Sequence, residues 1–434
     1  MTDPTRTLWT GFESSRGQFG RIVDGEGVHL ILEDGRRVLD GTNTGAPLGH
    51  RHPDIVEAMS RAARAPVIHE AWDSVARDKA TEDLAQIAFV QDPGWLGGVH
   101  WCLSGSEAND LALSLAQAFT GRSALATRVR AYHGGSGLAR DTTVQPQWRG
   151  GLVTTDGRNM PVPRNVAVHE LAGPLGERIG PNAPDAELDR AQLADAEAQL
   201  ADAAAVIIDY TQGGVYHSGA YQDHLAHAAG RAGALWIADE VVTGLGRTGC
   251  WFSFQGGETR PDMVTLGKGL GGGAAPCGAV LVSRNLAEQL DGALWQTAGT
   301  LRGHVGAASA ISAHLALLAR ERLVARAGEL DAVMLALLQE LASAHPSVRR
   351  IDGRGLHWTI ELHGTDWQHW HGDATREPIA TRVAAKALEA GALIMTSGEE
   401  GFLVLAPALI STEEDLERLV GALDHGLTLA DADV

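Results

Sequence analysis

The middle of the chain alternates between helical and strand-like hydrophobic patterns. Apolar residues recur at helical spacing over residues 186–203 and 226–232, and short, mostly apolar runs cover residues 205–208, 234–238 and 263–266. Such runs, placed between helices, are typical of strands that are buried on both faces of a parallel sheet. The pattern therefore predicts an α/β fold.

Each of the three apolar runs ends close to a charged residue. Asp209, Asp239 and Lys268 stand at these ends, 30 and 29 residues apart, which is about the length of one strand-helix-strand unit. The carboxyl ends of parallel strands lie along one edge of a sheet, where ligands bind. We therefore expect two carboxylates and a lysine to converge on one site.

The remainder of the chain predicts a smaller second domain. Residues 304–322 form an alanine-rich helical pattern that links the two domains, and strand-like stretches at 348–362 and 401–409 alternate with helical runs afterwards. We expect a large α/β domain, a small α+β domain and an amino-terminal segment that joins the small one. Their predicted limits are residues 56–320, 321–434 and 1–55.

Composition and charge exclude several classes of protein. None of the apolar runs approaches the roughly 18–20 residues that cross a bilayer, and the first residues lack the pattern of a secretory signal, so we expect a cytoplasmic location. Cys102, Cys250 and Cys277 lie far apart, which predicts neither disulfides nor a zinc cluster. The net charge of -19 disfavours nucleic acid and anionic membranes as partners.

Lys268 stands between a predicted buried strand and a glycine-rich segment, in V-T-L-G-K-G-L-G-G-G. A lysine in a poorly hydrated pocket loses part of its preference for the charged form, and its amine can then attack an aldehyde. The local pattern is equally compatible with a lysine that extends from a strand end to solvent. Other residues must decide between the two.

Two further segments are candidates for ligand contacts. S-G-S-E precedes a helical pattern, so the backbone amides of Gly105 and Ser106 could bind a phosphate at a helix amino terminus. The alternative is an ordinary helix cap at Ser104 or Ser106. Tyr132, in A-Y-H-G-G-S-G, offers a flat ring beside flexible backbone, although a single tyrosine is also compatible with a place in the core.

Taken in order, these motifs resemble the class III aminotransferases, which are pyridoxal-phosphate enzymes of fold type I. The matching segments are S-G-S-E-A-N (104–109), Y-H-G (132–134), D-E-V-V-T-G-L-G-R-T-G (239–249), P-D-M-V-T-L-G-K-G-L-G-G-G (261–273), G-T-L-R-G-H (299–304), L-G-H-R-H-P (48–53) and G-R-G-L (353–356). The resemblance covers nearly the whole chain. It implies a large domain with a mainly parallel seven-stranded sheet and a smaller α+β domain.

The resemblance assigns roles to the two charged residues of the best-matching motifs. Lys268 would bind the aldehyde of pyridoxal 5'-phosphate as a Schiff base and move the proton between substrate carbon and cofactor carbon. Asp239 would pair with the pyridine nitrogen and keep it protonated, so that the ring withdraws electrons. With these motifs around it, the alternative of a lysine that extends from a strand end to solvent becomes much weaker.

The same resemblance assigns the remaining cofactor contacts. Gly105 and Ser106 would hold the phosphate, Tyr132 would stack on one ring face and Val241 would pack against the other. Thr300 resembles the residue that reaches the phosphate of the neighbouring subunit. This implies a homodimer with shared active sites.

The chain departs from the family pattern where many members bind a substrate carboxylate. Val404 stands in the position of their arginine, and Glu413 replaces a mobile arginine that serves some amine-handling members. The usual Glu-Pro dipeptide reads Asp209-Tyr210. We therefore expect a pocket suited to an amine, an amino ketone or a larger peptide-borne substrate. Other candidate substrate contacts are Asn43, Trp72 and Arg302.

The predicted function is transfer of an amino group from a donor amine or amino acid to a ketone or aldehyde. A racemase, aminomutase or decarboxylase of the same fold is the first alternative. The glycines after Lys268 raise a nucleotide-binding oxidoreductase as a weaker one, because their spacing is not the dinucleotide fingerprint. A non-catalytic binding protein is disfavoured by the retained Lys268 and Asp239. The spacing of His357, His363, His369 and His371 does not predict a metal site.

Overall fold

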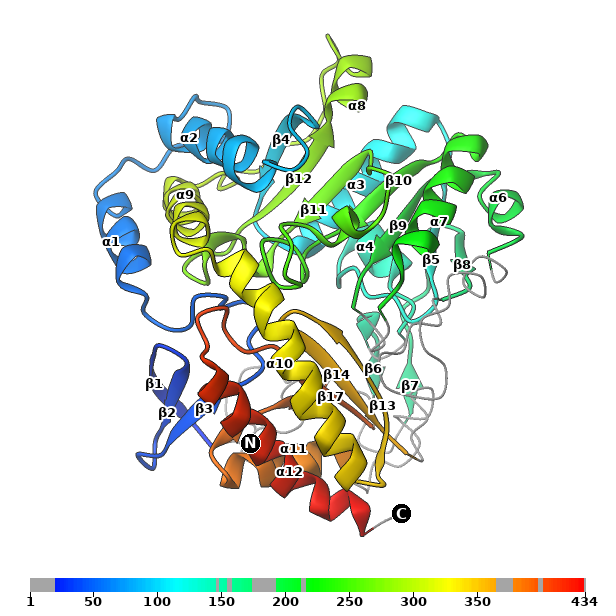
Figure 1. The fold of residues 1–434 in the computed structure, drawn as a ribbon. Coiled ribbons are helices and arrows are strands. Elements are labelled where there is room, and N and C mark those ends of the chain that lie inside the picture. Colours follow the sequence, from blue (N-terminus) through cyan, green and yellow to red (C-terminus); the bar gives the residue numbers. More distant parts are fainter. Residues whose placement is uncertain are drawn as a thin grey trace, which may run out of the picture.

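A seven-stranded sheet forms the centre of the larger part of the molecule (Figure 1). The computed structural model describes residues 20–145, 148–153, 158–173, 193–211, 216–363, 378–396 and 401–432. In sheet order the strands are β4 (Leu96–Cys102), β12 (Gly278–Ser283), β11 (Met263–Leu266), β10 (Leu235–Asp239), β9 (Ala203–Asp209), β5 (Ala124–Arg128) and β8 (Val168–Leu171). Only β12 runs antiparallel to its neighbours within this sheet. The mainly parallel seven-stranded sheet is confirmed.

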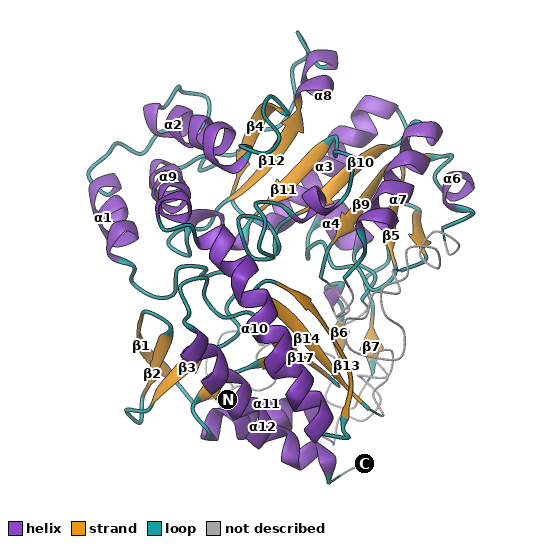
Figure 2. Ribbon diagram, in the orientation of Figure 1, coloured by secondary structure: helices purple, strands orange, loops and turns teal. Residues whose placement is uncertain are grey.

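Helices pack on both faces of this sheet (Figure 2). Ile207, Ile237 and Met263 share a buried cluster with α3 (Gly105–Thr120) and α8 (Arg284–Gln289). The alternate strand residues join the cluster that includes α7 (Gly219–Ala232) and α9 (Val305–Arg320). Successive side chains of a strand point to opposite faces, so a sheet covered on both sides needs continuous apolar runs.

A second, antiparallel sheet lies in the carboxyl-terminal part of the chain. Its order is β13 (Val348–Arg354), β14 (His357–Leu362), β17 (Phe402–Leu405) and β16 (Met395–Thr396). The helices of this part are α10 (Leu323–Ala344), α11 (Ile379–Glu389) and α12 (Glu413–Asp431). The amino-terminal strands β1 (Ile22–Glu26), β2 (His29–Leu32) and β3 (Arg37–Asp40) reach this part through β15 (Ala392–Leu393), which pairs with β3. The domain limits given above stay a prediction.

Shorter elements complete the described chain. They are α1 (Pro53–Ala62), α2 (Val75–Asp83), a π-helical turn (Leu84–Ala88), α4 (Gly137–Thr142), the hairpin β6 (Leu152–Val153) and β7 (Asn159–Met160), α6 (Ala196–Gln199), and 3-10 turns at Ser253–Gly256 and Lys268–Gly271. In the described part of the chain, no helix is long and apolar enough to cross a membrane. The three cysteines are free thiols.

The two parts meet with backbone against backbone. A Cβ atom built on Gly249 (φ +85°) would lie 2.7 Å from the Cα of Gly328 in α10, and one built on Gly355 (φ +57°) would lie 2.6 Å from the carbonyl carbon of Thr248. Only glycine permits both the positive φ and this distance. Arg247 adds hydrogen bonds to two backbone carbonyls of the smaller part.

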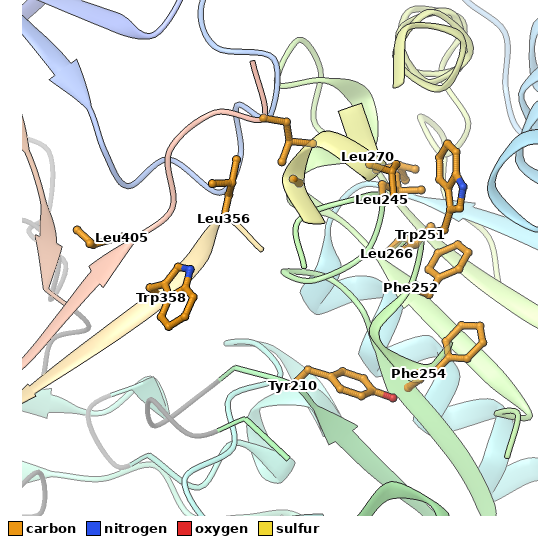
Figure 3. Close-up of a cluster of buried hydrophobic side chains, with 14 of the residues drawn as sticks. Tyr210, Leu245, Trp251, Phe252, Phe254, Leu266, Leu270, Leu356, Trp358 and Leu405 are labelled. Atoms are coloured by element: carbon orange, nitrogen blue, oxygen red, sulfur yellow. The ribbon is translucent and has the colours of Figure 1, made fainter. Parts of the chain in front are cut away.

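Large apolar side chains fill the space beside these glycines (Figure 3). Leu356, Trp358 and Leu405 come from the antiparallel sheet and its turn, and Leu245 and Leu270 come from the larger part. All five belong to one continuous buried cluster. The core therefore runs through the junction between the two parts.

Most predicted elements match the observed ones. The strand over 263–266 is β11, and the long helix over 304–322 is α9. The predicted helix over 186–203 lies partly outside the described residues, and from residue 193 onward only Ala196–Gln199 is α-helical.

Candidate active site

The carboxyl edge of the large sheet borders a cavity of about 350 Å³. Asp209 and Asp239 end neighbouring strands in register with each other, and Lys268 follows β11. All three line the cavity. The predicted cofactor contacts that also line it are Gly105, Ser106, Tyr132 and Val241. The structure thus brings seven residues from distant parts of the chain to one place.

A hydrogen-bonded network orients the carboxylate of Asp239. Asn109 Nδ2 donates to Asp239 Oδ2 at 2.7 Å, His133 Nδ1 lies 2.7 Å from the same oxygen, and the amide of Val241 donates to Oδ1 at 3.0 Å. Thr127 Oγ1 lies 2.9 Å from His133 Nε2. The network fixes the carboxylate so that it can pair with a protonated ring nitrogen in the cavity.

Sequence reasoning did not assign roles to Asn109 and His133. Both residues stand inside the quoted motifs S-G-S-E-A-N and Y-H-G, so the signal was present. Their contacts with Asp239 span 130 and 106 positions of the chain. Only the fold shows which carboxylate they hold.

Lys268 stands at the start of a tight turn with φ +38°, in the left-handed region that non-glycine residues rarely adopt. The Lys268 side chain is exposed to the cavity. Desolvation by the surrounding protein lowers the pKa of Lys268, and the Asp239 and Asp209 carboxylates oppose this effect. A lowered pKa increases the fraction of neutral, nucleophilic amine.

The amino terminus of α3 forms another part of the cavity wall. Ser104 is the helix cap, and its Oγ accepts a hydrogen bond from the amide of Glu107 at 3.2 Å. Among the described residues, no group accepts a hydrogen bond from the amides of Gly105 or Ser106. The cap and the anion site are therefore compatible, because they use different amides of one helix end.

Glycines allow this wall to approach the sheet. A Cβ atom on Gly105 would lie 2.5 Å from Val241 Cγ1, and one on Gly134 would lie 2.5 Å from Ser106 Oγ. On the neighbouring side, Tyr132 packs edge-on against Trp148, with ring centroids 6.1 Å apart. Burial raises the pKa of the Tyr132 hydroxyl, and Asp239 adds to this effect.

Three candidate substrate contacts lie elsewhere and do not line this cavity. Asn43 borders a separate groove, and its Oδ1 accepts a hydrogen bond from the amide of Gly45 at 3.1 Å. Trp72 is 70% exposed. Val404 is half-buried on β17.

Arg302 and Thr300 share one loop. Arg302 Nε donates to Glu107 Oε1 at 2.7 Å, and its Nη1 donates to Thr297 Oγ1 at 2.9 Å. Arg302 is buried and, like Thr300, does not line the cavity, whereas Thr300 is exposed. The roles assigned to both residues stay predictions.

The histidine-rich segment extends beyond the part of the chain described. His357 is buried near Tyr216, and its ring nitrogen and the tyrosine hydroxyl form a hydrogen bond. His369 and His371 lie outside the described residues. Within the described ranges, no group of three His, Cys, Asp or Glu residues could hold a metal ion.

Comparison with known proteins identifies the family. The model of the family described as Aminotransferase class-III matches residues 14–427. The chain belongs to the class III aminotransferases.

Relatives of this aminotransferase match it over almost its full length. An acetylornithine aminotransferase of Mycolicibacterium smegmatis is 32% identical over 95% of this chain and 94% of its own. An S-selective transaminase from Arthrobacter sp., solved with alanine bound, has a TM-score of 0.88 and 27% identity over 99% of this chain and 97% of its own. A phospholyase from Arthrobacter, solved with phosphoethanolamine, has a TM-score of 0.80 and 27% identity, covering 94% of each chain.

The fold and family fix the chemistry at a coarse level. The class III aminotransferase has the fold-type-I architecture and is a pyridoxal-phosphate-dependent enzyme that acts on an amine donor and a carbonyl acceptor. The cavity suits this cofactor. It offers an oriented carboxylate, a poorly hydrated amine and two available amides at a helix end.

Proposed function

We propose that this aminotransferase moves an amino group from a donor amine or amino acid to a ketone or aldehyde, and that one substrate is a non-standard amine or amino ketone of specialised biosynthesis. Peptide-borne substrates belong to this class. The observation that carries the proposal is the meeting of the Lys268 amine and the fixed Asp239 carboxylate in one cavity. Val404, where the family resemblance places an arginine, supports the choice of substrate.

Lys268 and Asp239 carry the chemistry in this proposal. When bound, pyridoxal 5'-phosphate supplies an aldehyde that accepts the amino group and a ring that withdraws electrons from the substrate carbon. Lys268 would hold the aldehyde and move the proton at the substrate carbon. Asp239, fixed by Asn109 and His133, would pair with the ring nitrogen and keep it protonated.

The remaining wall residues position the cofactor. The amides of Gly105 and Ser106 would hold its phosphate at the positive end of α3. Tyr132 and Val241 would contact its ring. The close contact of Gly105 with Val241 sets the width of the cavity on that side.

We further propose a homodimer in which Thr300 reaches the cofactor phosphate of the partner subunit. Large apolar side chains are exposed around this residue: Trp72 is 70%, Val75 87%, Leu294 86% and Leu301 47% exposed. The two segments that carry them adjoin, because the amide of Gly299 donates to Glu70. Exposed apolar patches of this kind mark association surfaces. A monomer in analytical ultracentrifugation would contradict this part.

Absorption spectroscopy and product analysis test the proposal. The purified protein should bind pyridoxal 5'-phosphate with a visible absorption band, and borohydride should bleach the band and leave a mass increase on the peptide that carries Lys268. Lys268→Ala should show neither change, whereas Lys79→Ala, a control at an exposed lysine, should behave as the native protein does. A protein that takes up no cofactor would sink the proposal.

The reaction itself needs a separate measurement. Transfer requires that each amine consumed yields one carbonyl product and one new amine. Racemisation, rearrangement, decarboxylation or elimination would instead convert a single substrate without this exchange between two substrates. The likeness to a phospholyase makes this measurement necessary.

A further inference from the structure

A buried ion pair stands beside the catalytic cavity without a role in the proposed chemistry. Arg128 Nη2 lies 2.5 Å from Asp209 Oδ1, and the side chains are 1% and 6% exposed. Arg128 Nε also donates to the carbonyl oxygen of Asp209 at 3.2 Å, and the amide of Thr211 donates to Oδ1 at 3.2 Å. Two independent groups therefore hold the Asp209 carboxylate in place.

The two members of this pair stand at the ends of neighbouring strands. Asp209 ends β9 and lines the cavity, whereas Arg128 ends β5 and does not line it. β5 is the neighbour of β9 on the side away from β10 and Asp239. Asp209 therefore borders the cavity, and Arg128 lies on the far side of it.

Arg128 comes from the same sheet as Asp209. The two residues belong to adjacent strands, and the arginine does not come from the smaller part of the molecule. Val404 stands where the family resemblance places an arginine, and Asp209 pairs with Arg128 instead.

Among the side chains that line the cavity, carboxylates outnumber cations. Among the described residues, Lys268 is the single lysine or arginine in the cavity wall, where Asp209 and Asp239 supply two carboxylates. Arg302 binds Glu107 and Thr297. Burial lowers the pKa of His217, close to the ion pair, to about 3, so this histidine adds no positive charge near neutral pH.

We propose that Asp209, held in place by Arg128, makes this cavity select amine substrates that have no carboxylate on the reacting carbon. The proposal rests on the proposed function and adds a residue and a substrate class to it. An ionised carboxylate in a poorly hydrated cavity repels a second carboxylate and accepts hydrogen bonds from ammonium or hydroxyl groups. Asp209 is the specificity-determining residue, and Arg128 is the positioning residue.

Alanine and 2-aminopropane form a matched pair of probes, because a carboxylate in one replaces a methyl group in the other. The half-reaction of each amine with the cofactor-loaded protein is followed by the change in cofactor absorption. In Asp209→Asn, kcat/KM for alanine relative to 2-aminopropane should rise about tenfold or more, the factor that 1.4 kcal/mol of repulsion gives. Most of the change should appear in KM for alanine.

Two further variants separate the role of the pair from general effects. Arg128→Met/Asp209→Asn removes both charges and leaves no buried ion unpaired. It can therefore be tested even if Asp209→Asn alone, with Arg128 unpaired, fails to fold. It should also raise the ratio, by less than Asp209→Asn, because no buried guanidinium remains to attract the carboxylate of alanine. Glu170→Gln removes one exposed carboxylate on neighbouring β8 and should leave the ratio unchanged. A ratio within twofold of the native value in Asp209→Asn and in the double variant overturns the proposal.

A titration of the cofactor-free protein tests Asp209 without any transamination. The titratable groups that line the cavity with Lys268 are Asp209, Asp239, Tyr132, His133, Tyr210 and Cys277, and His357 lies close enough for the Lys268 charge to act on it. Burial lowers the pKa of His357 to about 3 and raises that of Cys277 to about 12, and that of Tyr132 is also raised. Near neutral pH these three groups therefore keep one protonation state.

The apparent pKa of Lys268 is measured from the pH dependence of its labelling by trinitrobenzenesulfonate, with peptide mass spectrometry. Asp209→Asn should lower this pKa, because one of the two opposing carboxylates is lost, and Glu170→Gln should not. If the native protein reacts with neither amine, the proposed function fails, and the titration still decides whether Asp209 is an ionised wall of the cavity. An unchanged pKa in Asp209→Asn overturns the proposal in that case.

Discussion

Substitution of Gly105 by alanine tests the packing of the cofactor cavity. The new Cβ atom would lie 2.5 and 2.8 Å from the two methyl carbons of Val241, whereas carbon atoms pack at about 3.5–4.0 Å. Val241 must therefore shift by about 1 Å. Overpacking of this kind costs about 1–3 kcal/mol.

The structure indicates whether the overpacking destabilises the cofactor-free or the cofactor-bound protein. Val241 borders the cavity, so in the cofactor-free protein its side chain can move into open space. A bound cofactor fills that space, and the clash then opposes binding. A cost of about 1–3 kcal/mol corresponds to a Kd for pyridoxal 5'-phosphate that is about 5 to 160 times higher, with little loss of stability in the cofactor-free protein.

The assay is an absorbance titration of cofactor-free protein with pyridoxal 5'-phosphate. Gly98→Ala on β4 is the matched control, because a Cβ atom there meets nothing within 4 Å. Gly105→Ala/Val241→Ala removes both clashing methyl carbons and should recover part of the lost affinity. A Kd for Gly105→Ala within twofold of the native value would refute the reasoning, as would a large loss of stability with unchanged affinity.

Two other substitutions probe the polar interior. Asn109→Ala removes a donor to the buried Asp239 carboxylate, and a hydrogen bond to a charged group contributes about 1.5–3 kcal/mol. We therefore expect a lower Tm and weaker cofactor binding. An unchanged Tm and an unchanged Kd for the cofactor would contradict the role of the network. Desolvation opposes a raised pKa at His345, but its hydrogen bonds with Asp431 and Asp424 prevail and raise the pKa. The stability that His345 contributes is therefore fully present below its ordinary pKa of 6.5 and is lost as pH rises through the higher pKa of the folded state. In urea unfolding, His345→Gln should lower the free energy of unfolding most at acidic pH. An equal effect at all pH values would disprove this linkage.

The sequence predicted three strands of the large sheet, β9, β10 and β11, and the meeting of Asp209, Asp239 and Lys268, because buried parallel strands leave apolar runs and end at one edge. It did not predict how these side chains are held. The donors to Asp239 come from α3 and from the segment after β5, and their distance along the chain leaves no local pattern. Arg128 was missed for a related reason. A lone arginine at a strand end is indistinguishable from a surface residue until the neighbouring strand is known.

The backbone contacts of Gly249 with Gly328 and of Gly355 with Thr248 bear on how the substrate range of such an enzyme can change. Neither contact leaves room for a side chain, so a shift of one half of the molecule against the other would have to break both of them. Gradual reshaping by mutation is then confined to side chains around the cavity entrance. Libraries for laboratory evolution should vary those positions and keep these glycines fixed.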